Sequence, residues 1–131
     1  MIGLDTNVLL RYLVQDDARQ FARARRLIES GSTADDPAWI SLIVTAELVW
    51  ALRTHYGFAR GQIAEVIERL LNAAEVRFER EHLVDEAVAI YRGGRADLAD
   101  ALIVLVNREN GCEATASFDR KLVEAQLAVE P

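Results

Sequence analysis

Residues 1–10, MIGLDTNVLL, decide the fold class of this chain. The segment from Met1 to Leu4 is short and apolar, which predicts a strand that ends at Asp5. Thr6 and Asn7 then start an apolar stretch with helical character, residues 8–14. A strand that leads at once into a helix is the repeating unit of an α/β protein.

The same alternation continues along the chain. Further strands are predicted at residues 38–40, 75–78, 113–116 and 127–129. Helices are predicted at residues 18–30, 42–55, 60–72, 80–91 and 97–109, and a helical turn at residues 118–124. Five strands between helices predict a mainly parallel sheet, and no linker or repeat divides residues 1–131. We therefore expect a single α/β domain.

Composition limits the function. The 131 residues are 51% hydrophobic, which is enough for one core, and no uncharged stretch is long enough to span a membrane. Cys112 is the only cysteine, so we expect a reducing, cytoplasmic location. The net charge of −6 argues against tight, indiscriminate nucleic-acid binding, but it does not exclude a selective nucleic-acid enzyme. The basic residues are all Arg except Lys121, and Arg suits bidentate phosphate contacts.

Four acidic residues lie in or beside apolar segments: Asp5, Glu47, Asp100 and Asp119. Two like charges at 4 Å repel by roughly 4 kcal/mol at an effective dielectric constant of about 20, so a cluster of four needs protons or a cation. None has a His or Cys beside it. Their hard oxygen ligands favour Mg²⁺, with Mn²⁺ as the alternative, over Zn²⁺.

Each acid also has an ordinary structural explanation. Asp5 is suited to capping the helix that follows, although Thr6 and Asn7 are alternative caps. Glu47 falls on the helical stripe of Ile43 and Trp50, so we expect it to be buried and in need of a partner. Arg53, the nearest basic residue, is six positions away and poorly spaced for a helical ion pair.

The two late acidic segments leave similar alternatives open. Asp97 is placed to cap a helix whose first turn holds Asp100, although two carboxylates at a helix start also suit a cation. Asp119 is either a solvated turn residue or a site residue, with Ser117 placed to hold a metal-bound water. Arg92 and Arg95 flank two glycines near these acids, so we predict that they grip a substrate backbone.

Four motifs occur in a characteristic order: GLDTNVL at residues 3–9, SLIVTAELVW at 41–50, DLADALI at 97–103 and SFDRKL at 117–122. Together they resemble the PIN-domain family, and in particular its VapC-type toxins, over essentially the full length. The resemblance implies a metal-dependent endoribonuclease with a three-layer α/β/α fold and a five-stranded parallel sheet. It also implies homodimers and inhibition by a small VapB-like antitoxin, for which the apolar segments at residues 9–13 and at Trp50 are candidate contacts.

The same resemblance assigns residue roles. The acidic quartet of the family falls on Asp5, Glu47, Asp100 and Asp119, and Asp97 matches an additional acid found in many members. Ser117 matches a position that is often Thr or Ser.

Two other functions are compatible with an acidic pocket: a phospho-accepting signalling domain and a non-catalytic RNA-binding module. The first is disfavoured because Lys121 falls in a predicted helical turn instead of directly after a late strand.

Overall fold

The computed structural model describes residues 1–131 and contains a three-stranded parallel sheet. Its strands are β1 (Ile2–Gly3), β2 (Ala38–Ile40) and β3 (Val76–Phe78), in that spatial order. Ile2 is in register with Ala38, and Ala38 with Val76. The first three predicted strands and the α/β class are therefore confirmed.

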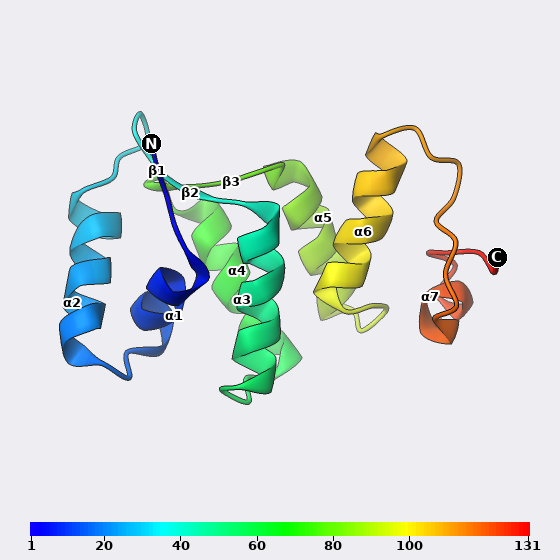
Figure 1. The fold of residues 1–131 in the computed structure, drawn as a ribbon, viewed down its shortest axis with the longest axis horizontal. Coiled ribbons are helices and arrows are strands. Elements are labelled where there is room, and N and C mark those ends of the chain that lie inside the picture. Colours follow the sequence, from blue (N-terminus) through cyan, green and yellow to red (C-terminus); the bar gives the residue numbers. More distant parts are fainter.

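Helices make up most of the molecule (Figure 1). They are α1 (Thr6–Val14), α2 (Ala18–Arg25), α3 (Leu42–Thr54), α4 (Arg60–Asn72), α5 (Glu81–Arg92), α6 (Leu98–Glu109) and α7 (Arg120–Glu124). None of them combines the length and the apolar character needed to cross a membrane.

The prediction of five strands is not confirmed. Residues 113–116 and 127–129 do not join the sheet, and a single parallel bridge between Ala116 and Val129 is all that links them. They belong to what we call the C-terminal arm, residues 112–131, which lies beyond α6 at the opposite end of the molecule from β1 (Figure 1). Side-chain contacts hold it there: Asn107 Nδ2 donates to Thr115 Oγ1 at 3.1 Å, and an Arg95 guanidinium nitrogen donates to the Ala125 carbonyl at 2.7 Å.

Local sequence signals explain the helix starts. Asp17 accepts hydrogen bonds from the backbone N–H groups of Arg19 and Gln20, and Ser41 Oγ accepts from Val44 N–H at 3.2 Å. The first helix ends at Gln15, which adopts the left-handed conformation with φ of 58°. The polar residues Gln15, Asp16 and Asp17 thus separate α1 from α2, in agreement with the gap between the predicted helices.

Helix α2 does not end as a regular helix. It continues as a π-helical turn, η1 (Arg26–Ser30), that stops at Gly31. A Cβ atom at Gly31 would lie only 2.9 Å from the Leu27 carbonyl oxygen. The turn can therefore close only because this residue has no side chain.

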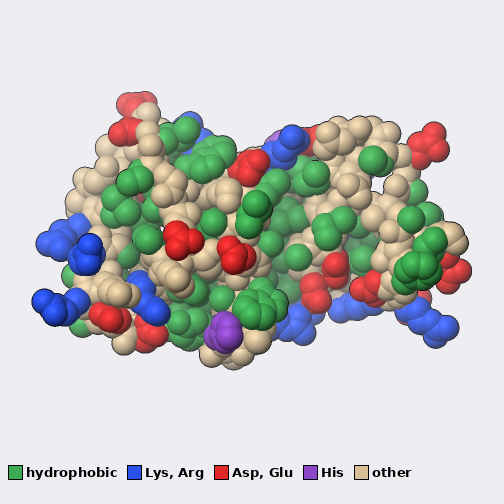
Figure 2. All heavy atoms as spheres, in the orientation of Figure 1, with side chains coloured by type: hydrophobic (Ala, Val, Ile, Leu, Met, Phe, Trp, Pro, Cys, Tyr) green, Lys and Arg blue, Asp and Glu red, His purple; other side chains and the backbone are tan.

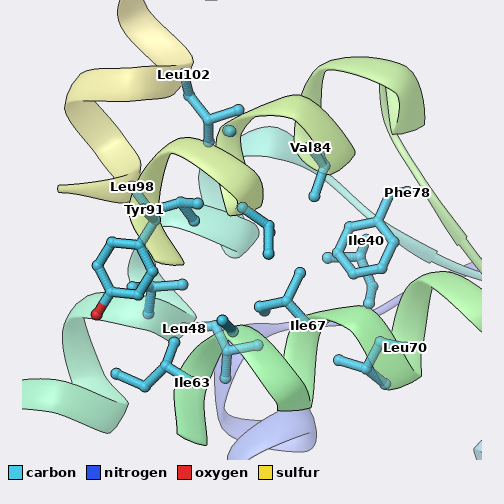
Figure 3. Close-up of a cluster of buried hydrophobic side chains, with 14 of the residues drawn as sticks. Ile40, Leu48, Ile63, Ile67, Leu70, Phe78, Val84, Tyr91, Leu98 and Leu102 are labelled. Atoms are coloured by element: carbon cyan, nitrogen blue, oxygen red, sulfur yellow. The ribbon is translucent and has the colours of Figure 1, made fainter. Parts of the chain in front are cut away.

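The core lies between the sheet and the helices α3 to α6 (Figure 3). Ile40 and Phe78 from the strands meet Leu48, Ile67 and Val84 from the helices. At one side of this cluster Tyr91 is buried, with its ring 4.5 Å from the Arg60 guanidinium carbon. This packing orients α3 and α6, which carry the predicted site acids Glu47 and Asp100.

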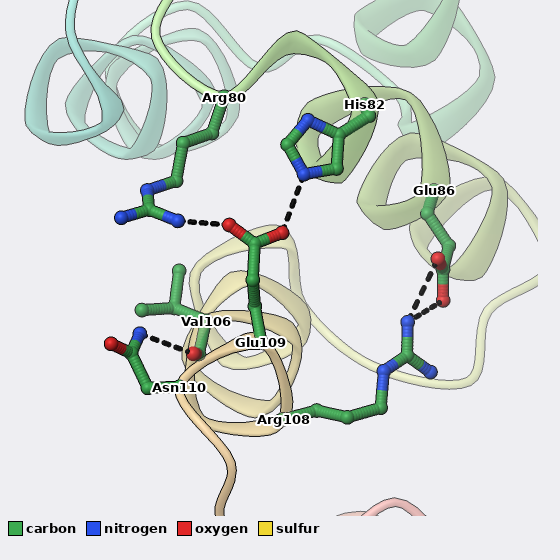
Figure 4. A network of polar contacts seen from close by, with 7 residues as sticks. All are labelled: Arg80, His82, Glu86, Val106, Arg108, Glu109 and Asn110. Atoms are coloured by element: carbon green, nitrogen blue, oxygen red, sulfur yellow. Dashed lines mark hydrogen bonds and ion pairs between the residues drawn. The ribbon is translucent and has the colours of Figure 1, made fainter.

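Polar contacts join α5 and α6 at the end opposite those acids (Figure 4). Glu109 accepts from both Arg80 and His82, and Arg108 forms a two-oxygen contact with Glu86. The hydrogen bond from His82 is the main reason that the pKa of Glu109 is lowered. These ion pairs fix how α6 lies against α5.

Candidate active site

The first candidate acid, Asp5, directly follows the first strand and precedes α1. Its backbone is extended, and its Oδ1 accepts from the Thr6 N–H at 2.9 Å. The side chain is exposed, and its Oδ2 makes no hydrogen bond. Asp5 is therefore a helix cap that still has a carboxylate oxygen available for a ligand.

Glu47 is on the surface, so the predicted burial of this residue is wrong. The face of α3 that carries it also carries Ile43 and Trp50, which are 74% and 59% exposed. The core face of α3 is instead formed by Thr45, Leu48 and Leu52. The helix is apolar nearly all round, so hydrophobicity alone could not identify the side that packs inward.

Thr6 connects Glu47 to the first strand end. Its hydroxyl is buried and donates to Glu47 Oε1 at 3.1 Å. This bond joins residues 41 positions apart and, because Thr6 N–H also donates to Asp5, it holds the carboxylates of Asp5 and Glu47 in one region. Asp5, Thr6 and Glu47 form what we call the α1–α3 group.

A second set of acids surrounds the start of α6. Asp100 is half-buried, and its pKa is raised by desolvation first and then by the charges of Asp119 and Asp97, while Lys121 acts in the opposite direction. Because the charges of Asp97 and Asp119 both raise the pKa of Asp100, these two carboxylates lie close enough to repel it. Asp97, Asp100 and Asp119 form what we call the α6–α7 group.

Asp97 and Asp119 have different contacts within this group. Asp97 stands at the cap position of α6 but makes no capping hydrogen bond. It accepts instead from Arg53 at 2.8 Å, with Arg60 at 3.8 Å. Asp119 caps α7 by accepting from the Lys121 N–H at 2.9 Å. Asp97 is thus an ion-pair residue, and Asp119 is a cap with an exposed carboxylate.

The two groups do not meet. No three acidic, His or Cys side chains come close enough to hold one metal ion between them. On the face shown in Figure 2, acidic side chains appear over α1 and α3 and again toward α6 and α7, with largely apolar surface between. Each group still offers the hard oxygen ligands of Mg²⁺, an ion that is often held by one or two carboxylates together with water and substrate phosphate. The donor chemistry therefore fits Mg²⁺, although the residues present in one chain form only partial sites.

The residues predicted to contact substrate or a metal-bound water, Arg92, Arg95 and Ser117, bond within the protein. Arg92 pairs with Glu68 at 2.8 Å, and Arg95 holds the arm through Ala125. Ser117 Oγ accepts from the backbone N–H of Asp119 at 3.0 Å. Asn7 is exposed and lines a surface pocket between α1 and α2 together with Arg11 and Arg23.

Sequence reasoning missed the role of Arg53. Arg53 is the nearest basic residue to Glu47 in the sequence, but in the structure it pairs with Asp97, 44 positions away. Such a separation leaves no local spacing that a sequence pattern can detect. The sequence hints only at a nearby site, because Arg53 lies in the last turn of the helix that also carries Glu47.

Comparison with known proteins gives two matches. The sequence profile described as PIN domain matches residues 2–126. The chain is also 27% identical over 118 residues to a VapC ribonuclease of Aquifex aeolicus (strain VF5), and this match covers 90% of the chain and 87% of the relative.

Proposed function

Because the chain belongs to the PIN-domain family, we propose that it is a Mg²⁺-dependent endoribonuclease that acts as the toxin of a toxin–antitoxin pair. The similarity to a VapC ribonuclease along nearly the whole chain supports this activity. Mn²⁺ is the alternative cofactor because it takes the same oxygen ligands.

The observation that carries the proposal is the repulsion around Asp100. Its pKa is raised partly by two neighbouring carboxylates, so the free protein holds negative charges together at a cost. A bound cation would remove that cost and lower the pKa of a water molecule near the scissile phosphate. This repulsion supports the binding of a cation at the α6–α7 group.

The roles are assigned to the two groups separately. Asp5 and Glu47 in the α1–α3 group and Asp100 in the α6–α7 group would supply the carboxylate ligands, directly or through water, of ions bound at these two partial sites. Asp119 orients the attacking water or completes a second ion site. Thr6 positions Glu47 through its hydroxyl, and Asp97 keeps Arg53 beside the α6–α7 group. In-line attack by water would leave 5′-phosphate and 3′-hydroxyl ends.

The proposed partners are RNA, a small VapB-like antitoxin and a second copy of the chain. The two candidate segments for antitoxin contact differ in exposure. Leu9 and Leu10 are buried in the core, whereas Trp50 is exposed beside Glu47 together with Ile43. We therefore place the antitoxin contact on this face of α3, where it would also cover an acid of the site.

The test is to incubate the purified protein with total RNA in Mg²⁺ or in EDTA and to sequence the cleavage ends. We expect 5′-phosphate ends that appear only with Mg²⁺. Asp100→Asn should abolish them, whereas Asp85→Asn, an exposed residue of α5 without an ion pair, should not. Ends with a 2′,3′-cyclic phosphate, or cleavage that persists in EDTA, would contradict the proposal.

A further inference from the structure

Strand β1 has an unpaired outer edge. Ile2 and Leu4 donate their N–H groups to Pro37 and Trp39 at 3.4 and 2.8 Å. Since alternate residues of a strand face the same neighbour, the N–H and C=O groups of Gly3 face away from β2. Ile2 is 47% exposed beside this edge, so β1 offers both backbone groups and apolar surface to an additional strand.

The arm has an unpaired edge of the same kind. Val129 N–H donates to the Thr115 carbonyl at 2.8 Å, and Ser117 N–H donates to the Val129 carbonyl at 2.9 Å. The N–H and C=O groups of Ala116 therefore face away from Val129. Phe118, next to this edge, is 90% exposed. The arm contains two extended segments, linked by a single parallel bridge, that offer an edge to a parallel sheet but join none in their own chain.

The other edge of the sheet is protected. Strand β3 carries Arg77 at its centre and is followed directly by the charged residues Glu79 and Arg80. Charged side chains on an edge oppose the addition of another strand. Of the two sheet edges, β1 is therefore the one suited to pairing.

The chain's own arm, as it lies here, does not reach β1, because contacts with Asn107 and Arg95 hold that arm at the opposite end of the molecule (Figure 1). The exposed surface points to a second copy as the occupant of this edge. The structure exposes 7689 Å², whereas a typical folded monomer of 14.6 kDa exposes about 6,900 Å². The excess, about 800 Å², is close to what each partner buries in a stable protein interface.

We propose that two copies exchange their arms, so that residues 113–117 of each copy pair in parallel with β1 of the other. In this register the Gly3 N–H of one copy donates to the Ala114 carbonyl of the other, and the Gly3 carbonyl accepts from the Ala116 N–H. Gly3 then lies opposite Thr115. Asp5 of one copy lies opposite Ser117 of the other, and Asp119 follows two residues after that Ser117. The exchange, which is reciprocal and closed, would complete the α1–α3 group with an acid from the second copy.

A disulfide test addresses the exchange without reference to activity. The variant carries Gly3→Cys and Thr115→Cys, with Cys112→Ser to remove the native thiol. A Cβ at Gly3 meets no atom within 4 Å, so this substitution should not prevent folding, which circular dichroism would verify. After mild oxidation we expect a dimer on a non-reducing denaturing gel that returns to monomer with reductant.

The matched control moves the first cysteine to the protected edge, with Arg77→Cys in place of Gly3→Cys. It should form little dimer at the same protein concentration. An intramolecular disulfide between the two introduced cysteines in a monomer, found by peptide mass spectrometry, would overturn the exchange. Equal dimer formation by the control, or no disulfide at all, would overturn it as well.

A complementation test rests on the proposed function. Asp5→Asn and Asp119→Asn chains are each expected to be inactive, but after co-refolding half of the dimers should carry one intact site. The mixture should recover roughly a quarter of the wild-type cleavage rate. Asp5→Asn mixed with Glu47→Gln should recover none. Asp5 and Glu47 of any one site come from the same copy, so every site in that mixture carries one of the two substitutions.

The two failures are distinguishable. An active wild type without recovery in the first mixture would overturn the exchange. An inactive wild type would overturn the proposed function, and the disulfide test would then still decide whether the arms are exchanged.

Discussion

At the scale of single residues, the hydroxyl of Thr6 has the most specific role. It is buried and bonded to Glu47, which is itself exposed and makes no ion pair. Thr6→Val keeps the shape and removes this bond, so we expect stability to fall by about 1 kcal/mol and the cleavage rate to fall roughly tenfold.

The control for Thr6 is Thr45→Val. Thr45 is also buried, but its hydroxyl donates to the Ser41 carbonyl within the start of α3. Urea unfolding should give similar losses of stability for the two variants, while only Thr6→Val slows cleavage. Equal rates in both variants would contradict a positioning role for Thr6.

Tyr12 makes the protein sensitive to alkali. Burial, followed by its hydrogen bond to Glu29, raises the pKa of Tyr12 from 10.0 to about 12. The folded state therefore keeps a proton that the unfolded state loses, so this contribution to stability is complete below pH 10 and disappears as the pH rises to about 12. The melting temperature of Tyr12→Phe should fall less over this interval than that of the wild type. Parallel curves would show that Tyr12 is not responsible.

At the scale of elements, the end of α1 contains a strained residue. Gln15 has a φ of 58°, a conformation that glycine adopts without steric cost. Gln15→Gly should raise the free energy of unfolding by up to about 1 kcal/mol. By contrast, Ala22→Gly on the exposed side of α2 should lower it by about 1 kcal/mol, and chemical denaturation measures both. A loss of stability in both variants would contradict the strain at Gln15.

The elements also show what the sequence could predict. Ser41 and Asp17 identify helix starts because a cap acts within three residues, and the strand before Asp5 follows from a local apolar pattern. Burial of Glu47 was predicted wrongly because α3 is apolar on both faces. The position of residues 113–116 could not be predicted, because it depends on Asn107 and on Arg95, which bonds the arm 30 residues away. The candidate acids were identified by type and order, but how they group is a property of the tertiary structure.

At the scale of the whole molecule, metal binding should stabilise the fold. A ligand that binds only the folded state at 100 times its Kd adds about 2.7 kcal/mol, so saturating Mg²⁺ should raise the melting temperature above that in EDTA. Asp100→Asn should raise the melting temperature in EDTA, because repulsion by Asp97 and Asp119 is relieved, and it should reduce the gain from Mg²⁺. Asp85→Asn should change neither, and an undiminished gain in Asp100→Asn would exclude that residue as a ligand.

The position of the arm, far from β1 in its own chain, has a consequence for dosage. If complete sites form only when two chains meet, their number rises with the square of the chain concentration while dimers are scarce. Specific activity would then increase with enzyme concentration instead of staying constant, and a dilution series measures this directly. A cell with few copies would carry little active enzyme, and doubling expression would increase it about fourfold.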